Sequence, residues 1–343
     1  MPSLYVTTPG TTIRLSGRTL QVELPAYDGQ PASNRILPLV EVERVIITAP
    51  TQTTTAALAA LAELDIPVAL VSWSGRVQGL LRPPSTATAG TRLEQYRRCL
   101  DESFCFEMAR LLIEAKILNQ RRILQRLAAN RPINLDEPLA QLDSLVQSTP
   151  RLTNRDMLRG IEGTAAAIYY QALDKLFPPE FPLEHRSRRP PHNPTNAVLS
   201  YAYTILAAEI EATLWSTGLD PALGFYHTVE DRRASLALDL LEPFRAPVCD
   251  ALAVDLFTHR MLQAEHFERR PADDPPGHGP TGCFLTLEGR RKFLVQYERR
   301  LERQFTYELT GQRTTLRGLI QDQCTQLKKT ILTHDPFLPF LMN

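Results

Sequence analysis

The stretch that decides the fold of this chain reads Gly224-Phe225-Tyr226-His227, followed by Ser235-Leu236-Ala237-Leu238-Asp239-Leu240-Leu241-Glu242-Pro243-Phe244-Arg245. It sets one histidine and two carboxylates, Asp239 and Glu242, among apolar side chains. An acid on a core-facing surface is costly unless it is paired or holds a cation. The two acids are spaced so that they share a face if the segment is helical. The pattern therefore favours a divalent metal site, and with it a reaction.

A third carboxylate, Glu162, lies in another apolar segment predicted to be helical. Leu158, Ala165 and Tyr169 fall on its helix face, so the Glu162 carboxylate is predicted to point into an apolar surface. Small residues nearby, Gly160 and Gly163 among them, would let another backbone or a ligand come close. The alternative is a carboxylate that pairs with a buried arginine.

Each residue has a simpler explanation when it is taken alone. Asp239 and Glu242 would complement a helix N-terminus, since Pro243 is best tolerated just inside a helix start. His227 would be a hydrogen-bonded core residue. Taken together, carboxylates with a single imidazole make a hard shell of oxygen and nitrogen ligands, which suits Mg²⁺ or Mn²⁺. The usual work of such a shell is phosphoryl transfer.

The bulk composition is that of an ordinary globular protein. The chain has 343 residues, 43% of them hydrophobic, and a formal net charge of zero. Its five cysteines form no CxxC pair, which argues against a disulfide framework and fits a reducing cytoplasm. We find no signal layout and no run of about 20 apolar residues. The absence of GxxxxGK[ST], of GxGxxG after a strand and of GxSxG makes ATP hydrolysis, dinucleotide redox chemistry and α/β-hydrolase chemistry unlikely.

The sequence predicts an α+β multidomain protein. Residues 1–82 read as a β-rich, sandwich-like domain with a short helix at 54–64, and residues 83–91 as a linker. Residues 92–343 read as an all-α catalytic domain, because the hydrophobic period becomes helical. Its predicted segments are 93–129 (one helix or two), 154–177, 194–217, 239–266, 289–307 and 314–333, with a loop at 268–280.

Arginines flank the acids and indicate a polyanionic substrate. Arg186 lies in a proline-rich loop, Arg232 between His227 and Asp239, and Arg245 just after Glu242. For single loop arginines, a solvated charge run is the alternative. One helix also carries a polar stripe that includes Asn196 and Ser200. That stripe would either line a substrate cleft or form a hydrogen-bonded seam between helices.

With these residues in view, the chain resembles the CRISPR-associated integrase/endonuclease that inserts new spacers into a CRISPR array. The resemblance covers nearly the whole chain and is specific only when its stretches are taken together. They are Lys116-Ile117-Leu118-Asn119-Gln120-Arg121, Ile161-Glu162-Gly163, Asn193-Pro194-Thr195-Asn196-Ala197-Val198-Leu199-Ser200-Tyr201 and the two stretches quoted at the start.

The resemblance implies that Glu162, His227 and Glu242 are catalytic metal ligands for Mg²⁺ or Mn²⁺, with Asp239 as a nearby auxiliary acid. It implies a transesterification in which a prespacer 3′-hydroxyl attacks a phosphodiester at the repeat boundary of double-stranded DNA, with metal-dependent DNA cleavage as the related hydrolysis. It also implies a homodimer formed through the β-rich domain. Two such dimers would bridge a dimer of a small ferredoxin-like partner, the second CRISPR-associated protein.

Two other functions remain open on the sequence alone. The first is a metal-dependent nuclease without integrase activity, which strand joining would separate from an integrase. The second is a non-catalytic DNA-binding scaffold, which the intact set of acids and histidine argues against. The predicted DNA contacts are Arg186, Asn196, Ser200, Arg232 and Arg245.

Overall fold

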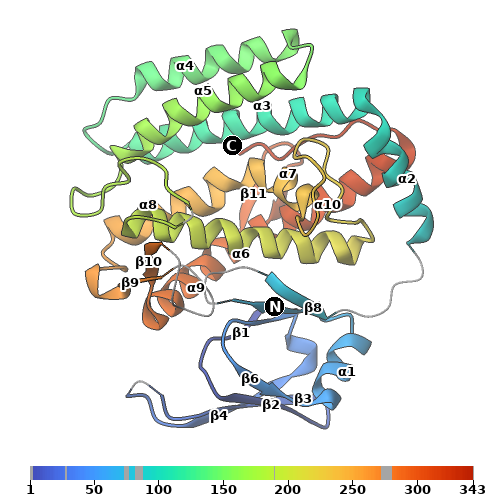
Figure 1. The fold of residues 1–343 in the computed structure, drawn as a ribbon, viewed down its shortest axis with the longest axis vertical. Coiled ribbons are helices and arrows are strands. Elements are labelled where there is room, and N and C mark those ends of the chain that lie inside the picture. The colour runs from blue at the N-terminus through green and yellow to red at the C-terminus, as the bar shows by residue number, and fades with distance from the viewer. Residues whose placement is uncertain are drawn as a thin grey trace. The chain divides into compact units, whose positions relative to one another are not determined.

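The computed structural model describes residues 3–27, 29–72, 77–81, 88–188, 190–271 and 280–342. The chain divides into two compact units, Met1–Thr86 and Ala87–Asn343 (Figure 1). Most of the linker predicted at 83–91 lies outside the described residues. The first helix of the second unit, α2, begins at Ala89, three residues before the expected start of the helical domain.

The first unit contains two four-stranded sheets that confirm the β-rich prediction (Figure 1). Residues 11–24 form a hairpin, with Gly17 in the left-handed region at its turn (φ +58°). One sheet is mostly parallel and has the order β1 (Ser3–Val6), β5 (Arg44–Ile47), β7 (Val68–Val71) and β8 (Val77–Leu81). The other has the order β4 (Ser33–Pro38), β3 (Thr19–Leu24), β2 (Thr11–Ser16) and β6 (Thr51–Thr53).

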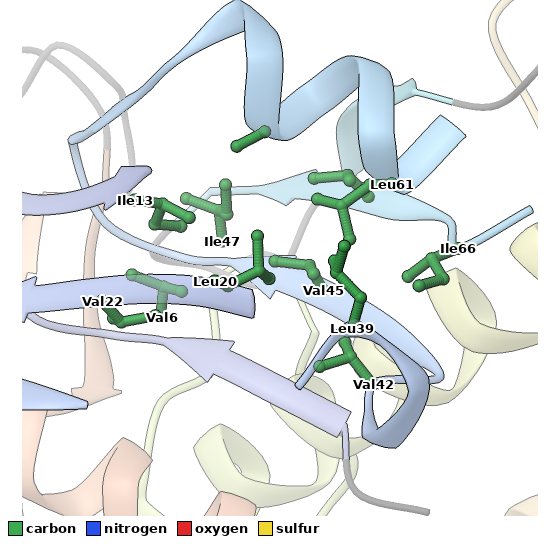
Figure 2. Close-up of a cluster of buried hydrophobic side chains, with 12 residues drawn as sticks. Val6, Ile13, Leu20, Val22, Leu39, Val42, Val45, Ile47, Leu61 and Ile66 are labelled. Atoms are coloured by element: carbon green, nitrogen blue, oxygen red, sulfur yellow. The ribbon is translucent and has the colours of Figure 1, made fainter. Parts of the chain in front are cut away.

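A cluster of apolar side chains from both sheets and the helix forms the centre of this unit (Figure 2). Ile13 and Leu20 come from one sheet, Val45 comes from the other, and Leu61 comes from α1 (Thr55–Glu63). Alternate residues of a strand point to opposite faces, so each sheet contributes every second side chain to one shared cluster. This arrangement is sandwich-like, as predicted, with α1 supplying part of the core.

The second unit is largely helical. The segment 93–129 forms two helices, because Asp101 ends the first and caps the second with its side chain on the Phe104 N–H (3.1 Å). Asn154 and Asn193 cap the helices that follow them, and each side chain accepts a hydrogen bond from the backbone N–H of the third residue beyond it. The helices are α2 (Ala89–Leu100), α3 (Glu102–Ala128), α4 (Asp136–Ser148), α5 (Arg155–Asp174), α6 (Pro194–Thr217), α7 (Ser235–Phe244), α8 (Ala251–Thr258), α9 (Leu287–Glu302) and α10 (Leu316–Thr333). Helix α4 was not predicted.

The helix expected at 239–266 is different in the structure. Helix α7 starts at Ser235, so Pro243 lies in its interior rather than in its first turn. A π-helix, Arg245–Asp250, follows and leads into α8. Asp239 therefore lies well inside a helix, and the idea that this acid simply complements a helix N-terminus is wrong.

The second unit also contains two short hairpins, so the all-α prediction is wrong in detail. Strands β9 (Phe267–Pro271) and β10 (Thr281–Leu285) pair antiparallel, as do β11 (Phe305–Tyr307) and β12 (Gln312–Thr314). Strand β9 occupies the start of the loop predicted at 268–280, whose residues 272–279 are outside the described ranges. Segments this short carry too little periodicity to be told from loops.

Helix α6 is long and largely apolar, and it packs against α7 and α10. Its length and hydropathy alone would also satisfy a membrane span, although the sequence analysis found no such run. In the structure, 72% of its most apolar window is buried by the rest of the chain. Its composition is therefore that of a core helix, which needs apolar residues on all sides.

Candidate active site

Three helices bring two acids and one lysine together. Lys116 lies on α3, Glu162 on α5 and Glu242 on α7. The Lys116 ammonium contacts Glu162 Oε1 and lies 2.8 Å from Glu242 Oε2. Its side chain is only 6% exposed and that of Glu242 only 2%. The partner of Glu162 is thus a lysine, where the sequence analysis considered a buried arginine.

The charges in this cluster stabilise one another. Burial raises the pKa of Glu242, but Arg245 and Lys116 outweigh burial and hold that pKa at about 2. Burial likewise lowers the pKa of Lys116, but Glu242 and Glu162 outweigh it, and the pKa ends above its usual value. The pKa of Glu162 falls because Lys116 more than offsets its partial burial. All three groups are therefore ionised at neutral pH.

The predicted face of Glu162 is present. Leu158, Ala165 and Tyr169 are buried beneath it, while the second carboxylate oxygen accepts a hydrogen bond from the Tyr226 hydroxyl (2.7 Å). Gly160 and Gly163 do not adjoin another backbone, since a Cβ built on either meets no atom within 4 Å among the described residues. The surface beside Glu162 is consequently open, which leaves room for a ligand.

Asp239 organises the loop that carries the histidine. Its carboxylate accepts hydrogen bonds from the backbone N–H groups of Phe225 (2.6 Å), Tyr226 (2.9 Å) and His227 (2.8 Å). A Cβ on Gly224 would approach Asp239 Oδ2 to 2.9 Å and the His227 carbonyl to 2.9 Å, so glycine is needed there. Asp239, buried completely, is therefore a positioning residue for the loop.

The same carboxylate orients the imidazole. Asp239 Oδ1 lies 2.7 Å from His227 Nδ1, which favours the tautomer with the proton on Nδ1. Nε2 is left with its lone pair and lies 4.0 Å from Glu242 Oε1. A carboxylate that fixes the far nitrogen of a histidine is the usual support for a metal-binding imidazole.

Arg245 extends the cluster toward a second buried acid. Its guanidinium pairs with Glu242 Oε1 (3.0 Å) and lies over the Tyr203 ring, 5.0 Å from the centroid. The hydroxyls of Tyr203 and Tyr169 each donate to one oxygen of Asp250, the latter at 2.7 Å. Burial raises the pKa of Asp250 to about 6, although both hydroxyls oppose the shift.

Asn119 fixes the bend that follows Glu242. Pro247 has no N–H to donate to the carbonyl of Pro243, and Asn119 Nδ2 donates to that carbonyl instead (2.7 Å). Asn119 also binds the C-terminal segment, through the carbonyl of Phe340 (2.9 Å) and the N–H of Met342 (2.7 Å). The asparagine and the lysine of the Lys116–Arg121 stretch thus serve the same site from one helix.

The predicted DNA contacts on α6 form an internal seam. Asn196 is 1% exposed, and its amide donates to the carbonyls of Leu183 and His185 while its oxygen accepts from Arg186 (2.8 Å) and from a backbone N–H. Arg186 also donates to Ser200 Oγ (3.1 Å). Because Asn196 has no polar atom left for DNA, its predicted contact is corrected to a structural role.

The remaining arginine predictions differ in their surroundings. Arg186 lies over the Tyr203 ring (5.3 Å), and Arg245 forms an ion pair with Glu242. Both guanidinium groups therefore stabilise neighbouring side chains within the protein. Arg232 is exposed, with a left-handed backbone (φ +63°). Of the three, Arg232 is the one placed most freely for a phosphate.

The residues fit a hard divalent cation by donor chemistry. Glu162, Glu242 and His227 Nε2 offer oxygen and nitrogen lone pairs, and the histidine is already oriented by Asp239. In the part of the chain that the structure describes, no three His, Cys, Asp or Glu side chains are gathered as a ready cation shell. The Lys116 ammonium instead supplies the positive charge between the two glutamates. The sequence singled out Lys116 only as part of the stretch Lys116–Arg121 that carries the family resemblance. The scarcity of lysine among the 38 basic residues was the available signal for its role.

Comparison with known proteins gives a consistent family. A model of the CRISPR associated protein Cas1 matches residues 4–299. The CRISPR-associated endonuclease Cas1 3 of Thermus thermophilus is 35% identical over 305 residues, which cover 88% of this chain and 87% of that protein. A CRISPR-associated exonuclease Cas4/endonuclease Cas1 fusion of Rhodospirillum rubrum is 34% identical over 98% of this chain. The chain spans 57% of the length of that fusion.

Solved structures share the fold. A Cas1 protein from Thermotoga maritima is similar with a TM-score of 0.79 and 25% identity over 97% of each chain. A chain of a Cas6-RT-Cas1–Cas2 complex gives 0.81 and 25% identity over 100% of this chain and 36% of that one. A casposase bound to integration product gives 0.87 at 23% identity, over 100% of this chain and 95% of that one, a likeness of fold. With the family model matched along most of its length, this chain belongs to the Cas1 family of CRISPR-associated proteins.

Proposed function

We propose that this chain is a metal-dependent DNA endonuclease and integrase that inserts prespacer DNA into a CRISPR array. The observation that carries the proposal is the oriented histidine: Asp239 holds His227 Nδ1, and Nε2 lies 4.0 Å from Glu242 Oε1. Glu242 in turn shares the Lys116 ammonium with Glu162. Family membership supports it, since the relatives of Thermus thermophilus and Rhodospirillum rubrum are named endonucleases.

Glu162, His227 and Glu242 are the residues that would hold Mg²⁺ or Mn²⁺. Such a cation supplies activation of an oxygen nucleophile and stabilisation of negative charge on the phosphate. The chain's own contribution is positional. Asp239 fixes the imidazole, and Arg245 holds one oxygen of Glu242.

In the proposed reaction, the 3′-hydroxyl oxygen of the prespacer forms a bond to a phosphorus at the repeat boundary. The bond from that phosphorus to the 3′-oxygen of the preceding nucleotide in the target strand breaks, and this oxygen takes up a proton while the attacking hydroxyl loses one. The number of phosphodiesters is unchanged, so no external energy source is required. Water in place of the hydroxyl gives DNA cleavage.

We further infer the assembly in which this reaction would occur. The chain would form a homodimer through its β-rich unit, and two dimers would bridge a dimer of the small partner Cas2. The solved Cas6-RT-Cas1–Cas2 complex supports this inference, because one of its chains has the same fold over the whole of this chain. Double-stranded prespacer and repeat DNA are the proposed substrates.

Strand transfer on a branched half-site DNA with Mn²⁺ tests the proposal, with wild type beside His227→Ala. We expect joined product from wild type and none from the variant. His259→Ala is the matched control, since His259 is an exposed histidine elsewhere in the same unit that contacts only the Asp255 carbonyl among the described residues. Circular dichroism and melting temperature would show that both variants fold.

The other outcomes discriminate among functions. Cleavage without joining would favour a nuclease that lacks integrase activity. DNA binding without either reaction, with the partner protein added, would favour a scaffold. Full activity of His227→Ala would reject the assignment of the site.

A further inference from the structure

The helical unit contains a cavity whose lining includes none of the residues of the acid, lysine and histidine cluster. It has a volume of about 420 Å³ and lies where α3 and α9 meet β11 and the C-terminal segment. Four arginines line it, two from α3 and two at the end of α9, together with one glutamate, Glu308. The arginines are Arg122, Arg126, Arg300 and Arg303.

The arginines crowd one another electrostatically. Burial lowers the pKa of Arg300, Asp255 opposes that shift, and the neighbouring charges of Arg126 and Arg303 lower the pKa further. Arg300 is held in place by two acceptors, the Pro247 carbonyl (2.8 Å) and Asp255 Oδ2 (3.2 Å). The like charges are therefore assembled around a fixed guanidinium, at a cost that a bound anion would relieve.

Two of these arginines are free to bind a ligand. Across the described residues, Arg126 and Arg303 have no hydrogen-bond or ion-pair partner, and both are exposed. Arg122 donates only to the neutral amide of Gln125 (3.1 Å). Guanidinium groups bind phosphate oxygens through paired N–H donors, so the cavity presents several unused phosphate donors on one wall.

The rest of the lining mixes apolar and polar side chains, and two of its residues are aromatic. Phe305 is half-buried on β11, whereas Phe340 is buried and stacked on Phe244. An aromatic face beside arginines is the combination on which a nucleobase stacks while its phosphate is bound. The volume lies within the range of small-molecule sites, about 300–1,000 Å³.

We propose that this cavity binds a phosphate-bearing ligand of nucleotide size, through Arg126 and Arg303. The shared chemistry is one phosphate and one base, supplied by a free nucleotide or by the 5′-terminal nucleotide of a single strand. The inference does not depend on the proposed integrase activity, because no residue of the acid cluster takes part.

Isothermal titration in EDTA, which removes divalent cations, tests the site. The probes are dAMP, deoxyadenosine and a short single-stranded oligodeoxynucleotide with or without a 5′-phosphate. The variant is Arg126→Gln with Arg303→Gln, two exposed side chains whose loss leaves the fold intact. The matched control is Arg313→Gln on β12, an exposed arginine that does not line the cavity.

We expect wild type and Arg313→Gln to bind dAMP but not deoxyadenosine, and the double variant to bind dAMP at least tenfold more weakly. Tighter binding of the 5′-phosphorylated oligonucleotide than of dAMP, lost in the same variant, would identify a strand end as the source. Equal binding of both would identify a free nucleotide. No binding of either probe by wild type, or equal affinity in wild type and the double variant, would overturn the proposal.

Discussion

The cores of the two units are built from different interactions. In the β-rich unit, side chains such as Ile13, Leu20 and Leu61 form a wholly apolar cluster (Figure 2). In the helical unit, Lys116 and Glu242 are buried as ions among apolar helices. Apolar burial is non-directional, whereas a buried ion depends on each of its partners. The first core should therefore lose stability in proportion to the volume removed, and the second should fail when one charge is removed.

The largest expected effect on stability comes from Lys116→Met. The change keeps the length of the side chain but leaves two glutamates without their shared cation. Removal of one partner of a buried pair costs about 3–5 kcal/mol, so the free energy of unfolding in EDTA should fall by that amount. If the site holds Mn²⁺, the metal should raise the melting temperature of the variant more than that of wild type. Urea and thermal unfolding measure both effects.

The exposed Lys175, changed to Met, is the control for this experiment. A Lys116 variant as stable in EDTA as the Lys175 variant would show that the ammonium does not hold the two acids. An equal melting shift with Mn²⁺ in wild type and variant would show that the ammonium does not compete with the metal.

Leu61→Ala probes the apolar core. Leu61 is 1% exposed on α1, and large-to-small changes of buried leucine cost about 2–5 kcal/mol. The midpoint of urea unfolding of the first unit should fall with an unchanged slope. Leu64→Ala, which truncates an exposed leucine at the end of the same helix, should change stability by less than about 0.5 kcal/mol. Similar losses in the two variants would mean that the cluster does not support the unit.

Two of the buried acids of the helical unit, Glu242 and Asp250, should respond to pH in opposite directions. The pKa of Glu242 is lowered to about 2 by cations, so its contribution to stability is present above about pH 4.5 and is lost as the pH falls toward 2. Burial raises the pKa of Asp250 to about 6, so this carboxyl ionises less readily in the folded protein than in the unfolded chain. The Asp250 carboxyl should therefore reduce stability as the pH rises from about 4 to 6.

Asp250→Asn removes that ionisation and should flatten the decline between about pH 4 and 6. Urea unfolding at a series of pH values, with the exposed Asp156→Asn as control, measures the difference. A decline of the same size in Asp250→Asn and wild type would assign it to other groups.

The smallest expected effect concerns the glycines near the site. Gly160→Ala adds a methyl group that meets no described atom on an exposed helix face, so stability should rise by about 0.5–1 kcal/mol. Gly224→Ala should instead lower stability, because its Cβ would approach Ser235 Cβ to 2.8 Å. Thermal unfolding of the pair checks the prediction. A destabilised Gly160 variant would show that this face is packed in solution.

Much of this architecture was readable from local signals. The caps Asn154 and Asn193, the hairpin turn at Gly17 and the apolar face beneath Glu162 depend on residues near one another in the chain. Spacing and side-chain type are sufficient for such features. The helix around Asp239 was harder, since a proline normally marks a helix start. At the bend that follows α7, Asn119 binds the carbonyl of Pro243, which Pro247 leaves without its helical donor.

The sequence by itself therefore determined the two-part fold and the helix faces of the acids. The ligand set Glu162, His227 and Glu242, which the family resemblance implies, stays a prediction. Only the tertiary structure decided that the Lys116 ammonium lies between Glu162 and Glu242. It also decided that Asp239 binds the backbone of the loop that carries His227, and that Asn196 is structural. The reason is distance along the chain. Local conformation follows from neighbours, whereas the partner of a buried charge is chosen by which helices pack together, and a single sequence does not record that choice.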